Sequence, residues 1–517
     1  MMANLLPVPV LLAIFGAAVA LALPRRPATQ RVVSVLSLSG IVAVAAVLIW
    51  HTHEVGPVAL WLANWPEPLG IALVADRLSS LMLFVASVVA LCVLLFATGQ
   101  DSDEVRRETP VSIFHPTFLL LMAGVSNAFL AGDLFNLFVG FEILLFASYV
   151  LLTLGGTGDR IRAGTTYVIV SLLSSSLFLI SISAVYAATG TVNLAHLAVR
   201  LRDLSEPVQL LLEVLLIVTF AVKAAMFPLG SWLPDSYPTA PAPVTAVFAG
   251  LLTKVGVYAI IRTETLLFPS SPVNDVLMVA SLLTMVVGIL GAIAQVEIKR
   301  MLSFTLISHI GFMIFGISLG SDAGMAATIF YTAHHITIQA TLFLVTGLIE
   351  RRGGTSSLEG LGGLLKVAPL LAVLFFLPAM NLAGIPPFSG FIGKLGLIQA
   401  GAAHGTILAW AVVAGGVLTS LLTLIAMAKV WNRAFWGVTP AEQRRAEAER
   451  LNEDIDELID DDTRPMPPLQ VGATMALVAF GLALTVFAGP LYEYTHAAAA
   501  TLRDGSYIVA VLPEALR

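Results

Sequence analysis

Three lysines lie inside long apolar stretches of the sequence, where a positive charge is costly. They are Lys223 in FAVKAAMFPLG, Lys254 in GLLTKVGVYA and Lys394 in GFIGKLGLI. A lysine at the centre of a bilayer costs roughly 2.5–3.5 kcal/mol, so three of them cost roughly 8–10 kcal/mol, comparable to a typical folding stability. Snorkelling to a membrane interface is the structural alternative, but we expect all three near the middle of their stretches. Lysines at these positions therefore predict a path for protons or other ions.

One carboxylate, that of Glu142 in LFVGFEILLFASYVLL, is expected in mid-span without a basic neighbour in the sequence. An unpaired carboxylate in that environment would simply hold a proton. Pairing with a lysine from another helix is the better explanation, and Lys223 is the natural candidate. Moving the carboxylate toward or away from this lysine would switch the lysine between holding and releasing a proton. A pump or an antiporter needs such an element.

Three histidines extend the set of candidate groups. His309 in SHIGFM and the adjacent His334 and His335 in YTAHHITIQ are expected in mid-span, and a free imidazole, with a pKa of about 6.5, suits proton relay. Adjacent side chains point about 100° apart on a helix, so only one of the pair can face a given channel. Packing in a core is the structural alternative for each of them. No i, i+4 pair of His, Asp or Glu accompanies them, so we expect no metal site.

The elements that position these groups must be membrane-spanning helices. Of 517 residues, 58% are apolar and only 12% are charged, whereas a soluble protein carries about 25% charged residues. This composition excludes soluble enzymes and nucleic-acid binders. Cys92 is the single cysteine, so the chain by itself can form neither a disulfide nor a thiolate metal cluster. The sequence has no GxGxxG or P-loop motif, and we expect no cofactor.

Apolar runs of about 18 residues or more predict an all-α polytopic membrane protein with about fourteen transmembrane helices. The expected spans are 5–23, 32–50, 78–98, 113–131, 134–154, 163–187, 208–228, 243–261, 273–296, 301–319, 325–348, 367–400 (broken), 406–428 and 469–490. Basic residues follow the first span instead of preceding it, so we expect this span to be retained and not cleaved as a signal peptide.

The distribution of basic residues favours one orientation. If the loop after the first span is cytoplasmic, eighteen of the 27 lysines and arginines lie on that side and six, Arg262 among them, lie on the other. The positive-inside rule then predicts that both termini lie outside.

Prolines interrupt two spans close to a lysine. Pro228 and Pro234 follow Lys223, and Pro386 and Pro387 precede Lys394. Backbone freed by proline is tolerated at membrane depth only where it faces protein or water. Broken helices 7 and 12, five spans apart, predict two inverted five-helix repeats. The predicted division is 1–100 for the first three helices, 101–263 and 264–435 for the repeats, 436–468 for a cytoplasmic linker, and 469–517 for the last helix and an external tail.

One segment is plainly not membrane. Residues 440–464 hold ten acids and four bases, a net charge of −6. Leu451, Ile455, Leu458 and Ile459 recur at helical spacing and predict a short amphipathic helix on the cytoplasmic side. A solvated linker and a helix that docks a partner are both consistent with this pattern.

Four sequence motifs resemble those of one family of membrane proteins and occur in the same order as in that family. GDLFNLFVGFEILLFASYVLL, VKAAMFPLGSWLPDSYPTAPAPVTAVFAGLLTKVGVY, KRMLSFTLISHIGFM and LAGIPPFSGFIGKL resemble the antiporter-like subunits shared by complex I, membrane-bound hydrogenases and Mrp-type cation/proton antiporters. The resemblance covers roughly residues 70–435. DLFNLFVGFE, and Lys394 where the middle complex I subunit usually has a glutamate, are most similar to the D-type subunits of Mrp antiporters.

The resemblance implies a proton-translocating subunit of a Na⁺/H⁺ antiporter in the bacterial plasma membrane, and not an enzyme. Glu142 and Lys223 would gate proton uptake, and Lys254 would connect them to the second half. His309, with one or both of His334 and His335, would continue a hydrophilic axis to Lys394 at the exit. The family implies no prosthetic group. Its partners would be a larger homologous A-type subunit and small hydrophobic subunits.

Two other functions stay open on the sequence. The same residues would serve a proton-pumping subunit of a redox complex, such as complex I or a membrane-bound hydrogenase, with electron transfer elsewhere as the driving force. A scaffold that only holds neighbouring subunits has no need of three buried lysines. Replacement of the lysines by methionine should then stabilise such a scaffold without loss of function.

Overall fold

Helices dominate the computed structural model, which describes residues 2–65, 70–99, 111–269, 271–439, 442 and 465–514. Thirteen helices within these ranges are long and apolar enough to cross a membrane. They are η1 with α1 (Met2–Ala22), α2 (Pro27–Glu54), α3 (Arg77–Thr98), α5 (Val111–Leu130), α6 (Leu134–Thr153), α7 (Gly158–Thr189), α9 (Glu206–Ala224), α11 to η6 (Ala242–Leu267), α13 (Val273–Ala294), α14 (Ile298–Ser318), α15 (Asp322–Gly353), α19 with η7 (Ile407–Phe435) and α21 (Pro468–Val486).

Shorter elements connect and cap these helices. They are α8 (Leu194–Arg200), α10 (Leu233–Ser236), α16 (Leu364–Val367), α17 (Pro369–Ala383), α18 (Ser389–His404), α22 (Ala488–Thr501) and α23 (Ser506–Val511). A small hairpin pairs β1 (Val58–Trp61) with β2 (Ala72–Ala75) in antiparallel register.

The predicted all-α membrane fold is confirmed. Thirteen of the predicted spans overlap the thirteen long helices, and the twelfth, 367–400, falls on the broken pair α17 and α18. The predicted amphipathic helix in 440–464 falls outside the described residues, apart from Glu442. The division into two inverted repeats stays a prediction.

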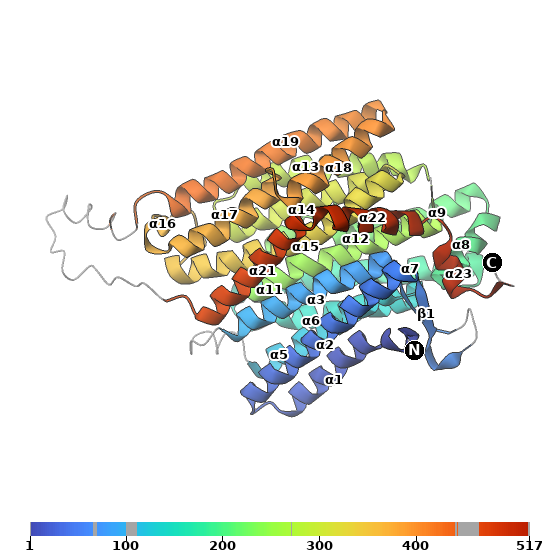
Figure 1. The fold of residues 1–517 in the computed structure, drawn as a ribbon, viewed down its shortest axis with the longest axis horizontal. Coiled ribbons are helices and arrows are strands. Elements are labelled where there is room, and N and C mark those ends of the chain that lie inside the picture. Colours follow the sequence, from blue (N-terminus) through green and yellow to red (C-terminus); the bar gives the residue numbers. More distant parts are fainter. Residues whose placement is uncertain are drawn as a thin grey trace.

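The helices run side by side along the long axis of the molecule, and both termini lie at the same end (Figure 1). The end of α19 and the start of α21 lie at the opposite end. α15 lies in the middle and packs against α3, α11, α14, α17, α18, α21 and α22. Together with α14 and the α11–η6 span it is almost completely buried. These three spans can therefore carry polar side chains away from lipid.

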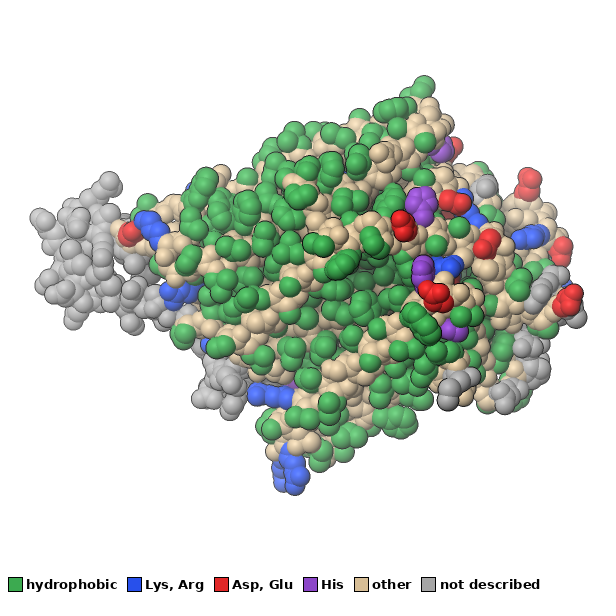
Figure 2. All heavy atoms as spheres, in the orientation of Figure 1, with side chains coloured by type: hydrophobic (Ala, Val, Ile, Leu, Met, Phe, Trp, Pro, Cys, Tyr) green, Lys and Arg blue, Asp and Glu red, His purple; other side chains and the backbone are tan. Residues whose placement is uncertain are grey.

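Hydrophobic side chains cover most of the face shown in Figure 2, while charged side chains gather toward the two ends of the helices. This distribution fits a lipid-facing surface, because a bilayer offers no hydrogen-bond partners to polar groups.

Both predicted helix breaks are present. α9 ends at Ala224 and Ala225 adopts a left-handed conformation (φ 60°), so the helix stops before Pro228. α17 ends at Ala383, Gly384 is left-handed (φ 85°), and α18 begins only at Ser389. Pro386 and Pro387 lie in the second gap, whereas Pro234 lies near the start of α10.

Two π-helical segments, η5 (Phe248–Leu252) and η6 (Thr263–Leu267), widen the buried span that begins with α11. Such π turns are rare and occur frequently at functional sites. The sequence pattern did not indicate them.

Candidate functional site

Ser175 stands between the side chains of Glu142 and Lys223. Its hydroxyl donates a short hydrogen bond to Glu142 Oε1 and accepts one from Lys223 Nζ at 3.3 Å. The three residues come from α6, α7 and α9, so three helices converge at this point. Among the ion pairs of the described residues, none joins the two charges directly. The Ser175 hydroxyl is therefore the group that lies between the ammonium and the carboxylate.

The apolar stretch predicted a position near the middle of a helix for Lys223. Lys223 is instead the penultimate residue of α9. The reason is the break directly after it, where Ala225 turns the backbone out of the helix. Its Nζ lies 4.7 Å from the centroid of the Phe141 ring, a distance at which the ring face attracts a cation.

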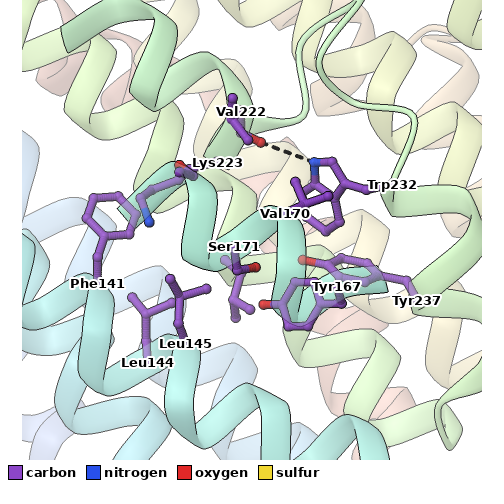
Figure 3. A pocket seen from close by; sticks show the side chains of 12 residues that line it. Phe141, Leu144, Leu145, Tyr167, Val170, Ser171, Val222, Lys223, Trp232 and Tyr237 are labelled. Atoms are coloured by element: carbon purple, nitrogen blue, oxygen red, sulfur yellow. Dashed lines mark hydrogen bonds between the residues drawn. The ribbon is translucent and has the colours of Figure 1, made fainter. Parts of the chain in front are cut away.

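A small cavity opens beside Lys223. Phe141 and Lys223 line one part of it, and Tyr167, Tyr237 and Ser171 line another (Figure 3). Its volume of about 20 Å³ is enough for about one water molecule. The hydroxyl of Tyr237 has no protein partner within the described part of the chain. The cavity thus combines room for a water with polar groups that could bind it.

Lys254 lies in α12 (Thr253–Arg262), directly after the π-helical segment η5. Its ammonium donates a hydrogen bond of 2.6 Å to the carbonyl oxygen of Ala249. α12 and α9 are in close contact at Gly256. A Cβ placed on this glycine would lie 2.8 Å from the backbone nitrogen of Ala224. Lys254 and Lys223 therefore sit on two helices whose backbones touch.

His309 lies between two hydroxyl groups in the second half of the chain. Its Nδ1 is 2.8 Å from the hydroxyl of Tyr331, and its Nε2 is 3.3 Å from the hydroxyl of Thr423. The ring of His335 lies 5.2 Å away, centroid to centroid. Both ring nitrogens of His335 are buried without a hydrogen-bond partner among the described residues. Four polar groups from α14, α15 and α19 thus meet at one place.

His334 points away from its neighbour, toward the second helix break. Its Nδ1 lies 3.0 Å from the hydroxyl of Ser389 at the start of α18. Lys394, also in α18, donates hydrogen bonds of 3.1 Å to the carbonyl oxygens of Leu382 and Ala383, the last residues of α17. A helix C-terminus carries a partial negative charge that stabilises a cation there. The adjacent histidines therefore face different neighbours, as the helical geometry predicted.

The groups of the second half lie within electrostatic reach of one another. His335 interacts in this way with Lys254, His309, His334 and Lys394. Lys223 interacts with Glu142. All seven predicted residues therefore fall into two neighbouring clusters, which meet where α9 and α12 touch.

Reasoning from the sequence missed two further sets of buried charges. Arg262 was placed in an outer loop, but it is buried in α12, where it forms a two-pronged ion pair with Asp76 at 2.6 and 2.7 Å. Glu213 in α9 and Glu264 in η6 are also buried, so Glu142 is not the one carboxylate within the spans. Continuation of the helix through the apolar TLLF after Arg262 was the signal that could have extended the eighth span.

Among the described residues, no group of three or more His, Cys, Asp or Glu side chains is placed to hold a metal ion. Hydroxyl groups lie beside several of the ionisable side chains, namely Ser175 between Glu142 and Lys223, Tyr331 and Thr423 at His309, and Ser389 at His334. Such neighbours suit proton transfer between side chains.

Comparison with known proteins gives a consistent result. Residues 131–423 match the family described as NADH:quinone oxidoreductase/Mrp antiporter, TM. The D-type subunit of the Na⁺/H⁺ antiporter of Alkalihalophilus pseudofirmus is 39% identical over 517 residues, which covers 99% of this chain and 100% of that protein. The corresponding D-type subunit of the Na⁺/H⁺ antiporter of Bacillus subtilis is 34% identical over 439 residues, which covers 84% of this chain and 88% of that protein.

Two solved structures have the same fold over nearly the whole chain. A chain of the Mrp complex from Dietzia sp. superposes with a TM-score of 0.87 at 34% identity, covering 99% of this chain and 100% of that one. A chain of the membrane-bound sulfane sulfur reductase, an archaeal respiratory membrane complex, superposes with a TM-score of 0.85 at 26% identity, covering 97% and 99%.

Proposed function

Because the chain belongs to the NADH:quinone oxidoreductase/Mrp antiporter family, and within it to the D-type subunits of Na⁺/H⁺ antiporters, we propose that it moves protons through a multisubunit Na⁺/H⁺ antiporter. It is a multi-pass membrane protein that works with other membrane subunits, as its relatives do. It acts as part of a secondary transporter and not as an enzyme.

The observation that carries this proposal is the bridge of Ser175 between Glu142 and Lys223. A hydroxyl that donates to the carboxylate and accepts from the ammonium can pass a proton between them without either group crossing the gap. Approach of Glu142 favours the charged lysine, and its withdrawal favours release of the proton. The pair thus works as a switch, and cation binding elsewhere in the complex can be coupled to its state.

From Lys223 the proposed route continues across the contact of α9 and α12 to Lys254. The histidine cluster follows, with His335 and His309 next to Lys254 and with His334 on the side of Ser389. Lys394 at the second helix break is the last group of the route. Its ammonium donates hydrogen bonds to carbonyl oxygens at the end of α17. The partial negative charge there stabilises the protonated lysine without a carboxylate partner.

The location and the partners are inferred in the same way. We place the protein in the bacterial plasma membrane with both termini outside, because the termini share one end of the helices and most basic residues follow the positive-inside rule. The partners we propose are a larger homologous A-type subunit and small hydrophobic subunits.

A proton pump of a redox complex is the second candidate, since the archaeal respiratory complex has a chain with the same fold. The identity of 26% to that chain is lower than the 34–39% to the antiporter chains, which favours the antiporter.

The experiment uses inverted membrane vesicles that contain the assembled complex. Addition of Na⁺ should collapse a preformed pH gradient in the wild type, and Lys223→Ala and Glu142→Gln should each reduce this collapse to a small residual rate while the complex stays intact. Lys366→Ala is the matched control, since Lys366 is an exposed lysine that pairs with Glu442, and it should leave the collapse unchanged. Full activity of either test variant would contradict the proposed roles.

A further inference from the structure

Two carboxyl groups that the route above does not use face each other inside the protein. Glu213 lies in α9 and Glu264 in the π-helical segment η6, and their exposed fractions are only 2% and 4%. α9 and η6 pack together at the end of the helices where the termini lie.

Few donors serve these two carboxyl groups. Glu213 Oε2 accepts a hydrogen bond of 2.5 Å from the hydroxyl of Ser271, and the two glutamate side chains interact with each other. Glu213 Oε1 and both oxygens of Glu264 receive no hydrogen bond from a protein donor among the described residues. Glu264 is thus an unpartnered buried carboxyl group that points at a second one.

The basic groups on the neighbouring helices are engaged elsewhere. α7, α8 and α12 pack against α9 and η6. In α8, Arg200 donates to the Nε2 atom of His196 at 3.1 Å, and in α12, Arg262 is bound to Asp76. No ion pair of the described residues includes either glutamate. α7 contributes Tyr186 as a titratable group at this end, and its side chain is exposed.

Ionisation of both of two buried carboxyl groups in contact is strongly unfavourable without a cation between them, because like charges at this distance repel, so one proton is retained at neutral pH. We propose that Glu213 and Glu264 form a carboxyl pair that holds one shared proton and exchanges it with the buried lysines of the route. A proton is favoured over a metal cation, since no group of three or more ligating side chains is found in the described part of the chain.

The positions of the pair connect it to the lysines. Glu213 and Lys223 are ten residues apart in α9 (213 to 223), and Lys254 and Glu264 are ten apart in the neighbouring span (254 to 264). Ten residues correspond to about 15 Å along a helix. Each of the two touching helices thus presents a lysine at depth and a glutamate nearer to the end that bears the termini. Loss of the shared proton breaks one O–H bond and leaves two carboxylates, and the proton forms an N–H bond with the neutral amine of a lysine of the route.

The exchange with the lysines rests on the proposed function, but the shared proton does not. The test is infrared difference spectroscopy of the purified complex between neutral and alkaline pH, in which a protonated carboxyl gives its own C=O band. We expect the wild type to lose such a band as the pH rises. Glu264→Gln and Glu213→Gln should each remove it, and Glu206→Gln, at the exposed start of the same helix, should keep it.

The possible outcomes separate the two claims. An unchanged band in both variants would overturn the carboxyl pair, and so would loss of the wild-type band on addition of Na⁺ at constant pH, which would identify a metal cation as the occupant. If Lys223→Ala left transport intact while the band behaved as expected, the route would fail and the pair would stand. A complex of either glutamine variant that assembles and shows normal bands elsewhere excludes misfolding as the cause.

Discussion

Lys223 Nζ donates a hydrogen bond of 3.3 Å to the Ser175 hydroxyl, and the helix that carries Lys223 ends at the next residue, Ala224. The helix break and the serine act together. The break frees the end of α9, and the serine connects the ammonium of Lys223 to the carboxylate of Glu142 on α6. The charge of the lysine can therefore respond to a movement of α6 or α7.

The serine bridge gives the first prediction. Ser175→Ala removes the hydroxyl between Lys223 and Glu142, and a hydrogen bond to a charged group is worth about 1.5–3 kcal/mol. Proton-coupled transport should fall by roughly tenfold to a hundredfold, measured as the rate of gradient collapse in vesicles. Ser176→Ala is the control, because Ser176 is exposed and, within the described part of the chain, its hydroxyl donates only to the carbonyl of Leu172. Equal rates for the two variants would exclude a relay through Ser175.

The contact between α9 and α12 gives the second prediction. A Cβ on Gly256 would lie 2.8 Å from Ala224 N and 3.1 Å from the Lys223 carbonyl carbon, so Gly256→Ala must push the two helices apart. We expect slower transport with the complex still assembled, because the step between Lys223 and Lys254 becomes longer. Gly472→Ala, where an added Cβ meets nothing within 4 Å, should behave as the wild type. Normal transport in Gly256→Ala would show that the route does not cross at this contact.

The ion pair between Asp76 and Arg262 gives the third prediction. It holds the start of α3 to the α11–η6 span, and both side chains are buried. Arg262→Met leaves a carboxylate buried and unpaired, which should cost about 3–5 kcal/mol of stability. Arg300→Met breaks the exposed pair with Asp235 and should cost at most about 1 kcal/mol. Thermal unfolding of the detergent-purified complex measures both, and equal midpoints would contradict a structural role for Arg262.

Asp133, just before α6, gives a prediction about pH. Burial raises the pKa of its carboxyl to about 6, whereas an aspartate in an unfolded chain has a pKa of about 3.9. The folded state therefore binds the proton more tightly, so this group's contribution to stability falls as the pH rises from about 4 to about 6. Asp133→Asn should remove this part of the pH dependence of the melting temperature. A wild type and variant with parallel pH profiles over that range would refute it.

The sequence predicted the spans and the breaks because they depend on local properties. Hydropathy locates an apolar helix, and a proline such as Pro387 limits where a helix can continue. The buried lysines were found for the same reason, since a charge in an apolar run is visible without a structure.

The partners of these residues could not be predicted in this way. Ser175 is one of several serines in α7, and only the packing of α7 against α6 and α9 selects it. The eighth span was predicted to end at residue 261, because Arg262 and Glu264 lower the hydropathy there. The structure extends the helix to Leu267, since Arg262 is paired with Asp76 from α3 and so can be buried.

The central claim is that Glu142 and Lys223 act as one unit in proton transfer. The most direct test is a double-mutant cycle in vesicles with Glu142→Gln, Lys223→Gln and both together, using the residual rate of Na⁺-driven proton movement at equal amounts of assembled complex. Residues that act as a unit are strongly non-additive, so the double variant should be no slower than the slower single variant. If the rate reduction in the double variant equalled the product of the two single reductions, the residues would act independently and the account would be contradicted. A wild-type rate in either single variant would contradict it as well.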